Sequence, residues 1–275
     1  MPHDIAPPSD ARTGNGALLR TLLDAINAND MAPLAAHPGL AQTRERVPPS
    51  HRAFDDWRFT RFLQLVEDDV VFSASTLALT HVAPFAGVAP TIGRTRVEID
   101  CCALDRVDDG IVVAHNATVD WPAAMRQLGA PGTAAWPRRA WHWPVSTPPA
   151  AVDASDVALG RATRRLRETL ERGALPVATP RTPSDSLTAE LATLRAACPD
   201  LAAEWGASVG QGDLVGVRTL LRGTHRAPLF GVEPTGRTLV WDHFGLARVA
   251  DGAVVEYDGI FAWTRLFAQL GLMRV

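Results

Sequence analysis

The pattern of apolar and polar positions divides the chain into two similar halves, each with helix-like runs first and strand-like runs afterwards. Apolar residues at helical spacing predict a helix over 17–28, with Asn15 as its N-cap. In the second half, helices are predicted over 157–172 and 187–197, the latter opened by polar residues 184–186. The predicted strands are 70–80, 96–107 and 111–119, with counterparts at 214–224, 238–249 and 253–261.

Glycines mark the turns of this pattern. Asp109-Gly110 and Asp251-Gly252 each lie between two apolar runs, which predicts a tight hairpin in each half. A short closing helix then ends at Gln-Leu-Gly, at 127–129 and again at 269–271, where glycine is a natural C-terminal cap. Helices followed by a series of antiparallel strands indicate an α+β fold.

The same short motifs occur twice, in the same order. Residues 80–91 are THVAPFAGVAPT and residues 224–235 are THRAPLFGVEPT, with eight of the twelve positions identical at an offset of 144. An offset of 142 then pairs RVDDG at 106–110 with RVADG at 248–252. Similarity in register across separated blocks predicts two tandem copies of one domain. We place the first copy at 14–130, a linker at 131–152 and the second copy at 153–275.

The linker is rich in proline and contains Trp136, Trp141 and Trp143. Such large aromatic side chains are expected to pack the linker against the surface of a domain. Contact with an aromatic ligand is the alternative.

Composition excludes several classes of protein. Apolar residues make up 47% of the chain and charged residues 21%, with a formal net charge of −3, so no basic field for nucleic acid is present. No run of about 18 apolar residues and no signal-peptide pattern occurs, so we expect no membrane span and a cytoplasmic protein. The three cysteines and eight scattered histidines form no CxxC or HExxH pattern, so no metal site is expected.

Several of these motifs resemble a known family. In the second copy they are GTHRAPLFGVEPTGR, RVADGAVVE and AQLGL, and in the first AINANDMAPL, RAFDDWRF, THVAPFAGV and RQLGA. Together they are similar to SnoaL-like polyketide cyclases (ester cyclases) of the nuclear-transport-factor-2-like superfamily. The resemblance implies two cone-shaped α+β barrels, each with helices packed on a strongly curved sheet around an apolar pocket. Because family members commonly dimerise through their sheets, the two copies could form an intrachain pseudo-dimer, and a homodimer is the alternative.

The resemblance also implies a reaction and a catalytic residue. Such cyclases close a ring in a small hydrophobic carbonyl compound by intramolecular aldol condensation, without a cofactor or metal. The family's general base is an Asp seven residues before the Gln of Gln-Leu-Gly, which is Asp120 in the first copy and Ala262 in the second. Burial in an apolar cleft would raise the pKa of Asp120 toward that of the proton it removes. Asp120 could equally serve as the N-cap of the closing helix.

Strand alternation predicts neighbours for Asp120 in the first copy. Asn116 and Asp120 lie on one face of their strand, and Asp100 and Arg106 share a face of the preceding strand. Arg106 lies fourteen residues before Asp120, where the resemblance implies a His that contacts the base. The sequence therefore allows a cluster of Asp100, Arg106 and Asp120, and a surface salt bridge is the alternative.

The second copy has other polar candidates. Asp258 lies on the face of Ala262, at a position where the family usually has Trp, and Asp242 lies on the face of Arg248. Asp258 could act as a displaced acid or could pair with Arg248.

His81 and His225 occupy equivalent positions in the two Thr-His-x-Ala-Pro segments. A residue that titrates near neutrality suits catalysis. The alternative is a loop anchor that hydrogen-bonds the backbone near the following proline.

Three functions therefore remain open. The first is a cyclase or isomerase with Asp120 as base in the first copy. The second is a non-catalytic pseudo-dimer that binds a small hydrophobic molecule, and the third is a hydrolase of the same fold. Nucleic acid and membranes are not expected partners.

Overall fold

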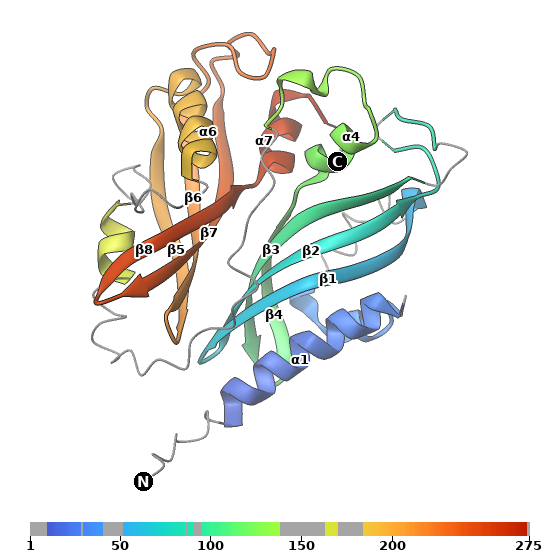
Figure 1. Ribbon diagram of the computed structural model, residues 1–275, viewed down its shortest axis with the longest axis vertical. Helices are drawn as coiled ribbons and strands as arrows, with labels where there is room; N and C mark the ends of the chain where they lie inside the picture. The colour runs from blue at the N-terminus through green and yellow to red at the C-terminus, as the bar shows by residue number, and fades with distance from the viewer. Residues whose placement is uncertain are drawn as a thin grey trace.

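The described part of the chain forms two four-stranded antiparallel sheets (Figure 1). The computed structural model describes residues 10–28, 30–40, 52–85, 87–90, 95–137, 163–169 and 184–273. Each sheet has its strands in sequence order, and its first and last strands are not paired with each other, so the sheets are open and not closed barrels. The expected tandem α+β architecture is confirmed, with this difference in closure.

The first copy and the start of the linker contain two helices, three short 3-10 helices and four strands among their described residues. Its elements are α1 (Asp10–Asn27), η1 (Pro33–Ala36), η2 (Pro38–Leu40), β1 (Phe54–Glu67), β2 (Val70–His81), β3 (Arg96–Asp108), β4 (Ile111–Val119), α4 (Trp121–Gln127) and η3 (Thr133–Ala135). The second copy repeats this order. Residues 163–169 are helical, and α6 (Ser184–Ala197), β5 (Ala202–Gln211), β6 (Leu214–Thr224), β7 (Thr238–Ala250), β8 (Ala253–Phe261) and α7 (Trp263–Leu270) follow.

The six predicted strands are confirmed to within one residue at each end. Asp109 and Gly110 both have positive φ, as do Asp251 and Gly252, which fits the predicted hairpin turns. The N-cap prediction for Asn15 is wrong, because α1 begins at Asp10. The Asn15 side chain instead donates a 3.0 Å hydrogen bond to the carbonyl of Asp68 and ties the helix to the β1–β2 turn.

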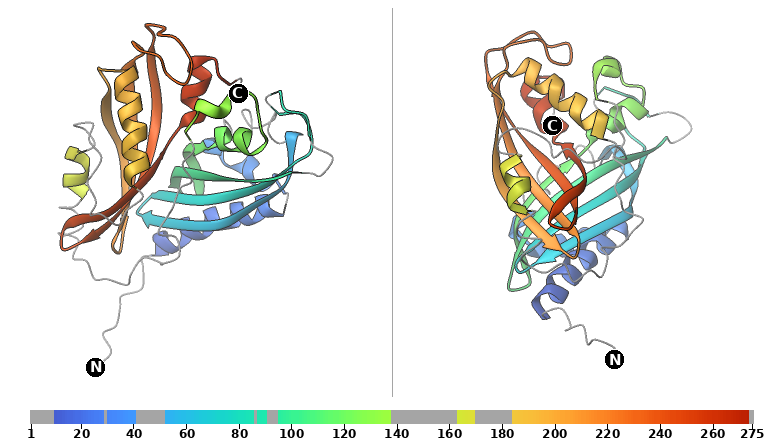
Figure 2. Two further views of the ribbon diagram at one scale, coloured as in Figure 1. Left: turned by 45° about the horizontal axis from the view of Figure 1, so that its top comes forward. Right: turned by 60° about the vertical axis from the view of Figure 1, so that its left-hand side comes forward.

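Each sheet has an inner face, covered by its own helices, and an outer face, turned toward the other sheet (Figure 2). On the inner face of the first sheet, α1 packs through Leu19 and Leu22 against Val71 and Val112. On the outer face, Phe72 and Leu104 belong to one buried cluster with residues of the second sheet. The two copies are therefore joined sheet to sheet, as an intrachain pseudo-dimer.

Equivalent residues meet at this interface. Glu67 and Gln211 correspond at the offset of 144, and each binds the other copy. The Glu67 carboxylate accepts a 2.7 Å hydrogen bond from the Gly210 amide, and the Gln211 side-chain carbonyl accepts one of 2.9 Å from the Val66 amide. This reciprocity is what an approximate two-fold axis between the copies requires.

Phe72 and Gly216 are also equivalent, and they lie against each other. The ring of Phe72 occupies the place that a Cβ atom on Gly216 would need. A large side chain in one copy thus fills the space that its small counterpart leaves in the other.

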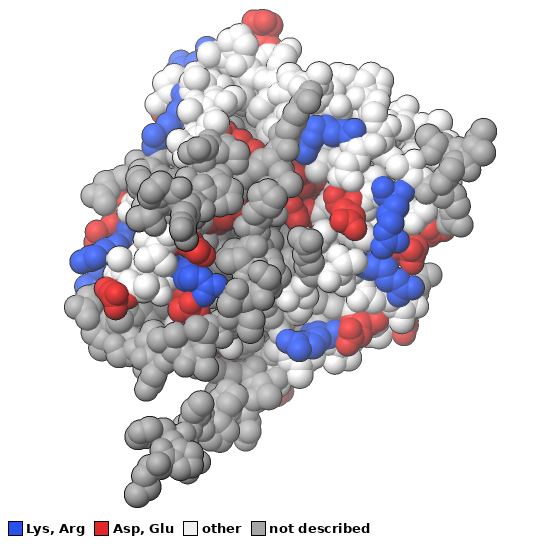
Figure 3. Space-filling model, viewed as in Figure 1, with Lys and Arg blue, Asp and Glu red and all other residues white. Residues whose placement is uncertain are grey.

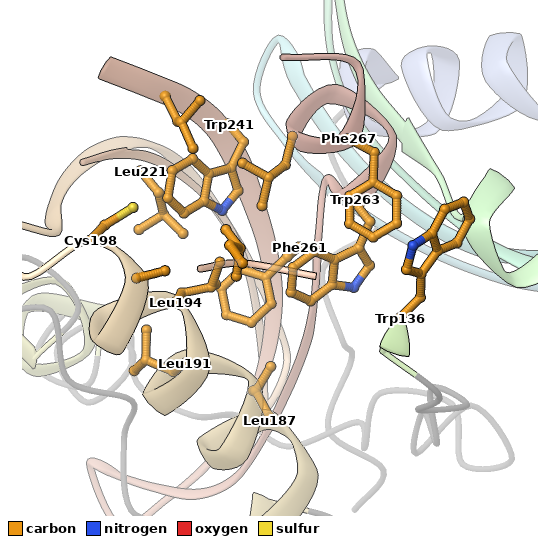
Figure 4. Close-up of a cluster of buried hydrophobic side chains, with 14 of the residues drawn as sticks. Trp136, Leu187, Leu191, Leu194, Cys198, Leu221, Trp241, Phe261, Trp263 and Phe267 are labelled. Carbon is orange, nitrogen blue, oxygen red and sulfur yellow. The ribbon is translucent and has the colours of Figure 1, made fainter. Parts of the chain in front are cut away.

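The inner face of the second copy is closed by a large aromatic core (Figure 4). Leu187, Leu191 and Leu194 of α6 pack there with Trp241 and Phe261 of the sheet. Helices α4 and α7 lie side by side at one end of the molecule (Figure 1).

The start of the linker joins this core. Trp136 is buried, and its ring centroid lies 4.6 Å from that of Phe267 in α7. The expected packing of the linker on a domain is confirmed for Trp136. Trp141 and Trp143 lie outside the described residues.

Arginine and acidic side chains alternate over the face shown in Figure 3, in keeping with the small net charge. Among the described residues, no helix is both long and apolar enough to cross a membrane.

Candidate functional site

Asp120 lies where β4 ends and α4 begins. Its side chain is 7% exposed, and its Oδ1 accepts a 3.0 Å hydrogen bond from the amide of Ala123, so it is the N-cap of α4. Its own amide donates to the carbonyl of Asp100 at 2.9 Å, which extends the β3–β4 pairing to this point. Asp120 is therefore a buried acid fixed by both a strand and a helix.

The environment raises the pKa of Asp120 to about 6. Burial is the largest cause, because it penalises the charged carboxylate, and the negative charge of Asp100 adds to it. The charge of Arg126 and the hydrogen bond from Ala123 act in the opposite direction. The carboxyl group can thus exchange a proton near neutral pH.

Asp100 and Cys101 are the neighbours of Asp120 on β3. Asp100 is half-buried and accepts a hydrogen bond of 3.3 Å from the Thr76 hydroxyl. Burial raises the pKa of the Cys101 thiol, and the charges of Asp100 and Asp120 contribute, so these groups share one electrostatic environment. The acids at this end of β3 are balanced in part by Arg126 of α4, whose charge acts on Asp120.

Arg106 does not join this group, which corrects the predicted cluster. It shares a strand face with Asp100, but it lies six residues further along β3, about 20 Å away at the usual rise of a strand. It is exposed and pairs in register with Ala114. Asn116 is half-buried opposite Leu104, on the outer face that packs against the second sheet.

In the second copy, the acid equivalent to Asp100 is bound by arginine side chains. Asp242, equivalent to Asp100, forms ion pairs of 2.5 Å with Arg218 and 2.7 Å with Arg265. The residues of the first copy equivalent to these arginines are Ala74 and Ala123. With Ala262 in place of the base, the second copy holds one acid bound by two arginines, where the first holds two acids and the charge of Arg126 acts on Asp120.

The other polar candidates of the second copy lie elsewhere on its sheet. Arg248 forms ion pairs with Asp213 and Glu256. Asp258 is buried at the sheet–sheet interface opposite Leu246, and its Oδ1 accepts a 2.8 Å hydrogen bond from the Gly259 amide.

His225 acts as a loop anchor. It is fully buried, and its Nδ1 accepts a 3.3 Å hydrogen bond from the amide of Thr235, which follows Pro234. His81 is equally buried, and its ring lies 5.3 Å from that of Phe54. The residue equivalent to Thr235 is Thr91, which lies outside the described residues.

An acid–base pair that the sequence analysis did not single out lies on the inner face of the first copy. His115 of β4 is opposite Asp105 of β3, and its Nδ1 is 2.5 Å from the Asp105 Oδ1. Burial alone lowers the pKa of His115, but the charge and hydrogen bond of Asp105 outweigh burial, and the net pKa is raised. Hairpin symmetry about Asp109-Gly110 would place residue 105 opposite residue 114. The register shift between Arg106 and Val107 brings His115 opposite Asp105 instead, and no signal in the sequence indicates that shift.

No group of three or more His, Cys, Asp or Glu side chains that could hold a metal ion occurs in the described part of the chain. The three cysteines are buried thiols.

Comparison with known proteins covers both copies. The family model described as SnoaL-like polyketide cyclase matches residues 11–128 and 161–270. Among solved structures, AclR from Streptomyces galilaeus is 24% identical over 42% of this chain and 87% of its own, with a TM-score of 0.38. IdmH from Streptomyces antibioticus is 36% identical over 32% of this chain and 63% of its own, with a TM-score of 0.29. TsrD from Streptomyces laurentii is 21% identical over 43% and 97%, with a TM-score of 0.37. A search of curated proteins gave no match.

Proposed function

This chain belongs to the SnoaL-like polyketide cyclase family, and we propose that its first copy closes a ring in a hydrophobic carbonyl compound with Asp120 as general base. The second copy, which has Ala262 at that position, serves as the non-catalytic half of the pseudo-dimer. The buried carboxyl group of Asp120 at the β4–α4 junction is the observation that supports this proposal most.

The chemistry needs one group that takes a proton and returns it. The Asp120 carboxylate removes a proton from a carbon flanked by carbonyl groups, and the electron pair of the broken C–H bond forms an enolate. The enolate carbon then bonds to a second carbonyl carbon of the same molecule, whose oxygen takes the electron pair of the broken π bond. The proton on Asp120 passes to that oxygen, so the step consumes no oxidant or reductant.

The raised pKa suits this role. A carboxylate with a pKa of about 6 is a stronger base than an exposed aspartate and is still largely ionised at neutral pH. Burial, which causes the shift, would also strengthen contacts to a developing enolate because water is excluded.

The helix cap offers the matched experiment. Asn is as good an N-cap as Asp, so Asp120→Asn keeps α4 capped and removes only the titratable carboxylate. We expect the cyclisation rate of an aromatic β-ketoester polyketide, followed by chromatographic separation of substrate and product, to fall about 100-fold or more. Asp109→Asn is the control, because Asn tolerates the positive φ of that turn, and it should retain the wild-type rate. Equal rates for wild type and Asp120→Asn would contradict the proposal.

A binding protein without catalysis is the second candidate, and the engagement of Asp120 Oδ1 in the helix cap favours it. In that case, wild type and Asp120→Asn should bind the substrate with equal affinity and release it unchanged.

A further inference from the structure

His115 and Asp105 lie between two apolar clusters on the inner face of the first copy. On one side, Val71 and Val112 pack against α1, and on the other Ile99 and Cys101 pack near α4. The Asp105 side chain is 4% exposed, whereas the His115 side chain is 17% exposed. Because Nδ1 is bound to Asp105, the ring presents Nε2, which has no hydrogen-bond partner among the described residues.

The inner face beside His115 is made of small side chains. Ser73, Ala103 and Ala117 are paired in register across β2, β3 and β4, so they form one row on the inner face. Ser73 and Ala103 are half-buried and Ala117 is exposed, although all three lie on the helix-covered side of the sheet. Solvent therefore reaches the middle of this face.

The same row is covered in the second copy. Its equivalents are Val217, Gly245 and Gly259, all buried. The Tyr257 hydroxyl lies over Gly245, where a Cβ atom would stand, and the His243 ring lies over Gly259 in the same way.

Tyr257 is the counterpart of His115, and Ala247 is the counterpart of Asp105. The second copy thus replaces the acid–base pair with a side chain that fills the inner face. The first copy, whose inner face is open, has His115 and Asp105. The second copy, whose inner face is filled, lacks both residues.

We propose that His115, oriented by Asp105, is a ligand-binding residue of the first copy that donates a hydrogen bond from Nε2 to an anionic oxygen of a flat polyketide-like ligand. This inference rests on the proposed function, since it takes the ligand to be a substrate of the first copy. A carboxylate or an ionised β-dicarbonyl oxygen supplies the required charge.

The small side chains of this row favour a flat molecule as the ligand.

The charge of His115 follows from the groups around it. Asp105 faces it from β3, and its interaction holds the pKa of His115 above the ordinary value. His37, next to η1 and η2, is bound through Nδ1 to the amide of Val112 on the same strand. Arg20 and Asp24 of α1 are exposed and face solvent. His115 is therefore a cation at mildly acidic pH and a donor at Nε2.

The test compares two flat probes that differ only in charge, anthraquinone-2-carboxylate and anthraquinone-2-carboxamide. The full chain should bind the carboxylate about tenfold more tightly at pH 6, as expected for one charge-assisted hydrogen bond, and lose this preference at pH 9. His115→Gln should abolish the preference at both pH values while the carboxamide affinity stays the same. Asp105→Asn should shift the loss of preference to lower pH.

A purely structural His115 would instead change the affinity for both probes equally. That result would overturn the proposal. So would a carboxylate preference that persists in His115→Gln, or a wild-type chain that binds neither probe. Asp120→Asn separates the two proposals. If it retains full cyclisation while His115→Gln loses the preference, His115 binds ligand and Asp120 is not the base. If it abolishes cyclisation while His115→Gln behaves as wild type toward both probes, only the role of His115 is refuted.

Discussion

Phe72 of the first copy packs directly on Gly216 of the second, and the two residues occupy equivalent positions of the repeat. At the centre of a symmetric dimer a residue meets its own copy, so two phenylalanines would collide there and two glycines would leave a void. The tandem chain resolves this with one large and one small residue.

We expect Gly216→Ala to destabilise the protein by about 1–3 kcal/mol, because the new methyl group would displace the Phe72 ring. Urea unfolding measures this change. Gly14→Ala is the control, since no atom lies within 4 Å of its added methyl group and alanine favours the helix. It should leave stability equal or higher.

Exchanging the two residues tests whether they act as a pair. Phe72→Ala should cost about 3–5 kcal/mol through the cavity it leaves. The double variant Phe72→Gly with Gly216→Phe places the ring on the opposite copy, and it should be more stable than the sum of its two single changes by about 1 kcal/mol or more. Strict additivity would show that the contact is not complementary.

Glu67 should act at the interface through its oxygen and not through its charge. Glu67→Gln makes the residue identical to its counterpart Gln211 and keeps an acceptor for the Gly210 amide, so stability should change by less than about 0.5 kcal/mol. Glu67→Ala leaves that amide without its partner and should cost about 1–3 kcal/mol. Thermal unfolding of the two variants side by side would reveal an equal loss if charge were the main contribution.

The buried acid should make stability fall with rising pH. The pKa of Asp120 in the folded protein is about 6, above its ordinary value of 3.8, so the folded state binds this proton more tightly than the unfolded state. Stability from this group is complete below about pH 4, decreases by about 3 kcal/mol as pH rises to about 6, and stays constant above that.

Asp120→Asn removes that dependence while it keeps the helix cap. The variant should be more stable than wild type at pH 8 and similar at pH 4, as measured by denaturant unfolding at both values. Equal differences at the two pH values would mean that the carboxyl group is not desolvated.

Filling the open row of the first copy should remove ligand binding. Ala117→Trp puts a large side chain on an exposed position of the inner face, so we expect at least a tenfold loss of affinity for anthraquinone-2-carboxylate with stability changed by less than about 1 kcal/mol. Ala253→Trp, at an exposed position of the second copy, is the control and should bind as wild type. Calorimetric titration distinguishes the two variants.

The strands that the sequence predicted are those with regular alternation, and the two it missed are the first of each sheet. In β1 the charged residues Asp55, Asp56 and Arg58 interrupt the apolar pattern, and register shifts occur at the same place. Asp56 has a φ of 52°, which breaks the period of two that strand prediction needs. The bulge in β5 near Gly206 has the same effect.

The site was predictable in part. Alternation correctly put Asp100 and Asn116 on neighbouring strands of one face, but it could not tell which face the helices cover, because both faces of the sheet are buried. The prediction that Arg106 lies beside Asp100 was wrong for a different reason. Both residues are on the same face of β3, but Arg106 is at the opposite end of the strand. Alternation tells which face a side chain is on, and its distance from another residue also depends on their positions along the strands.

The covalent tie between the two sheets has a consequence for how the assembly responds to its surroundings. Partners that share one backbone meet at an effective concentration fixed by the chain, so dilution cannot separate them as it separates an ordinary dimer. The two copies can then differ in sequence without loss of the interface. The second copy can have a tightly packed core while the first keeps an open inner face that contains charged side chains.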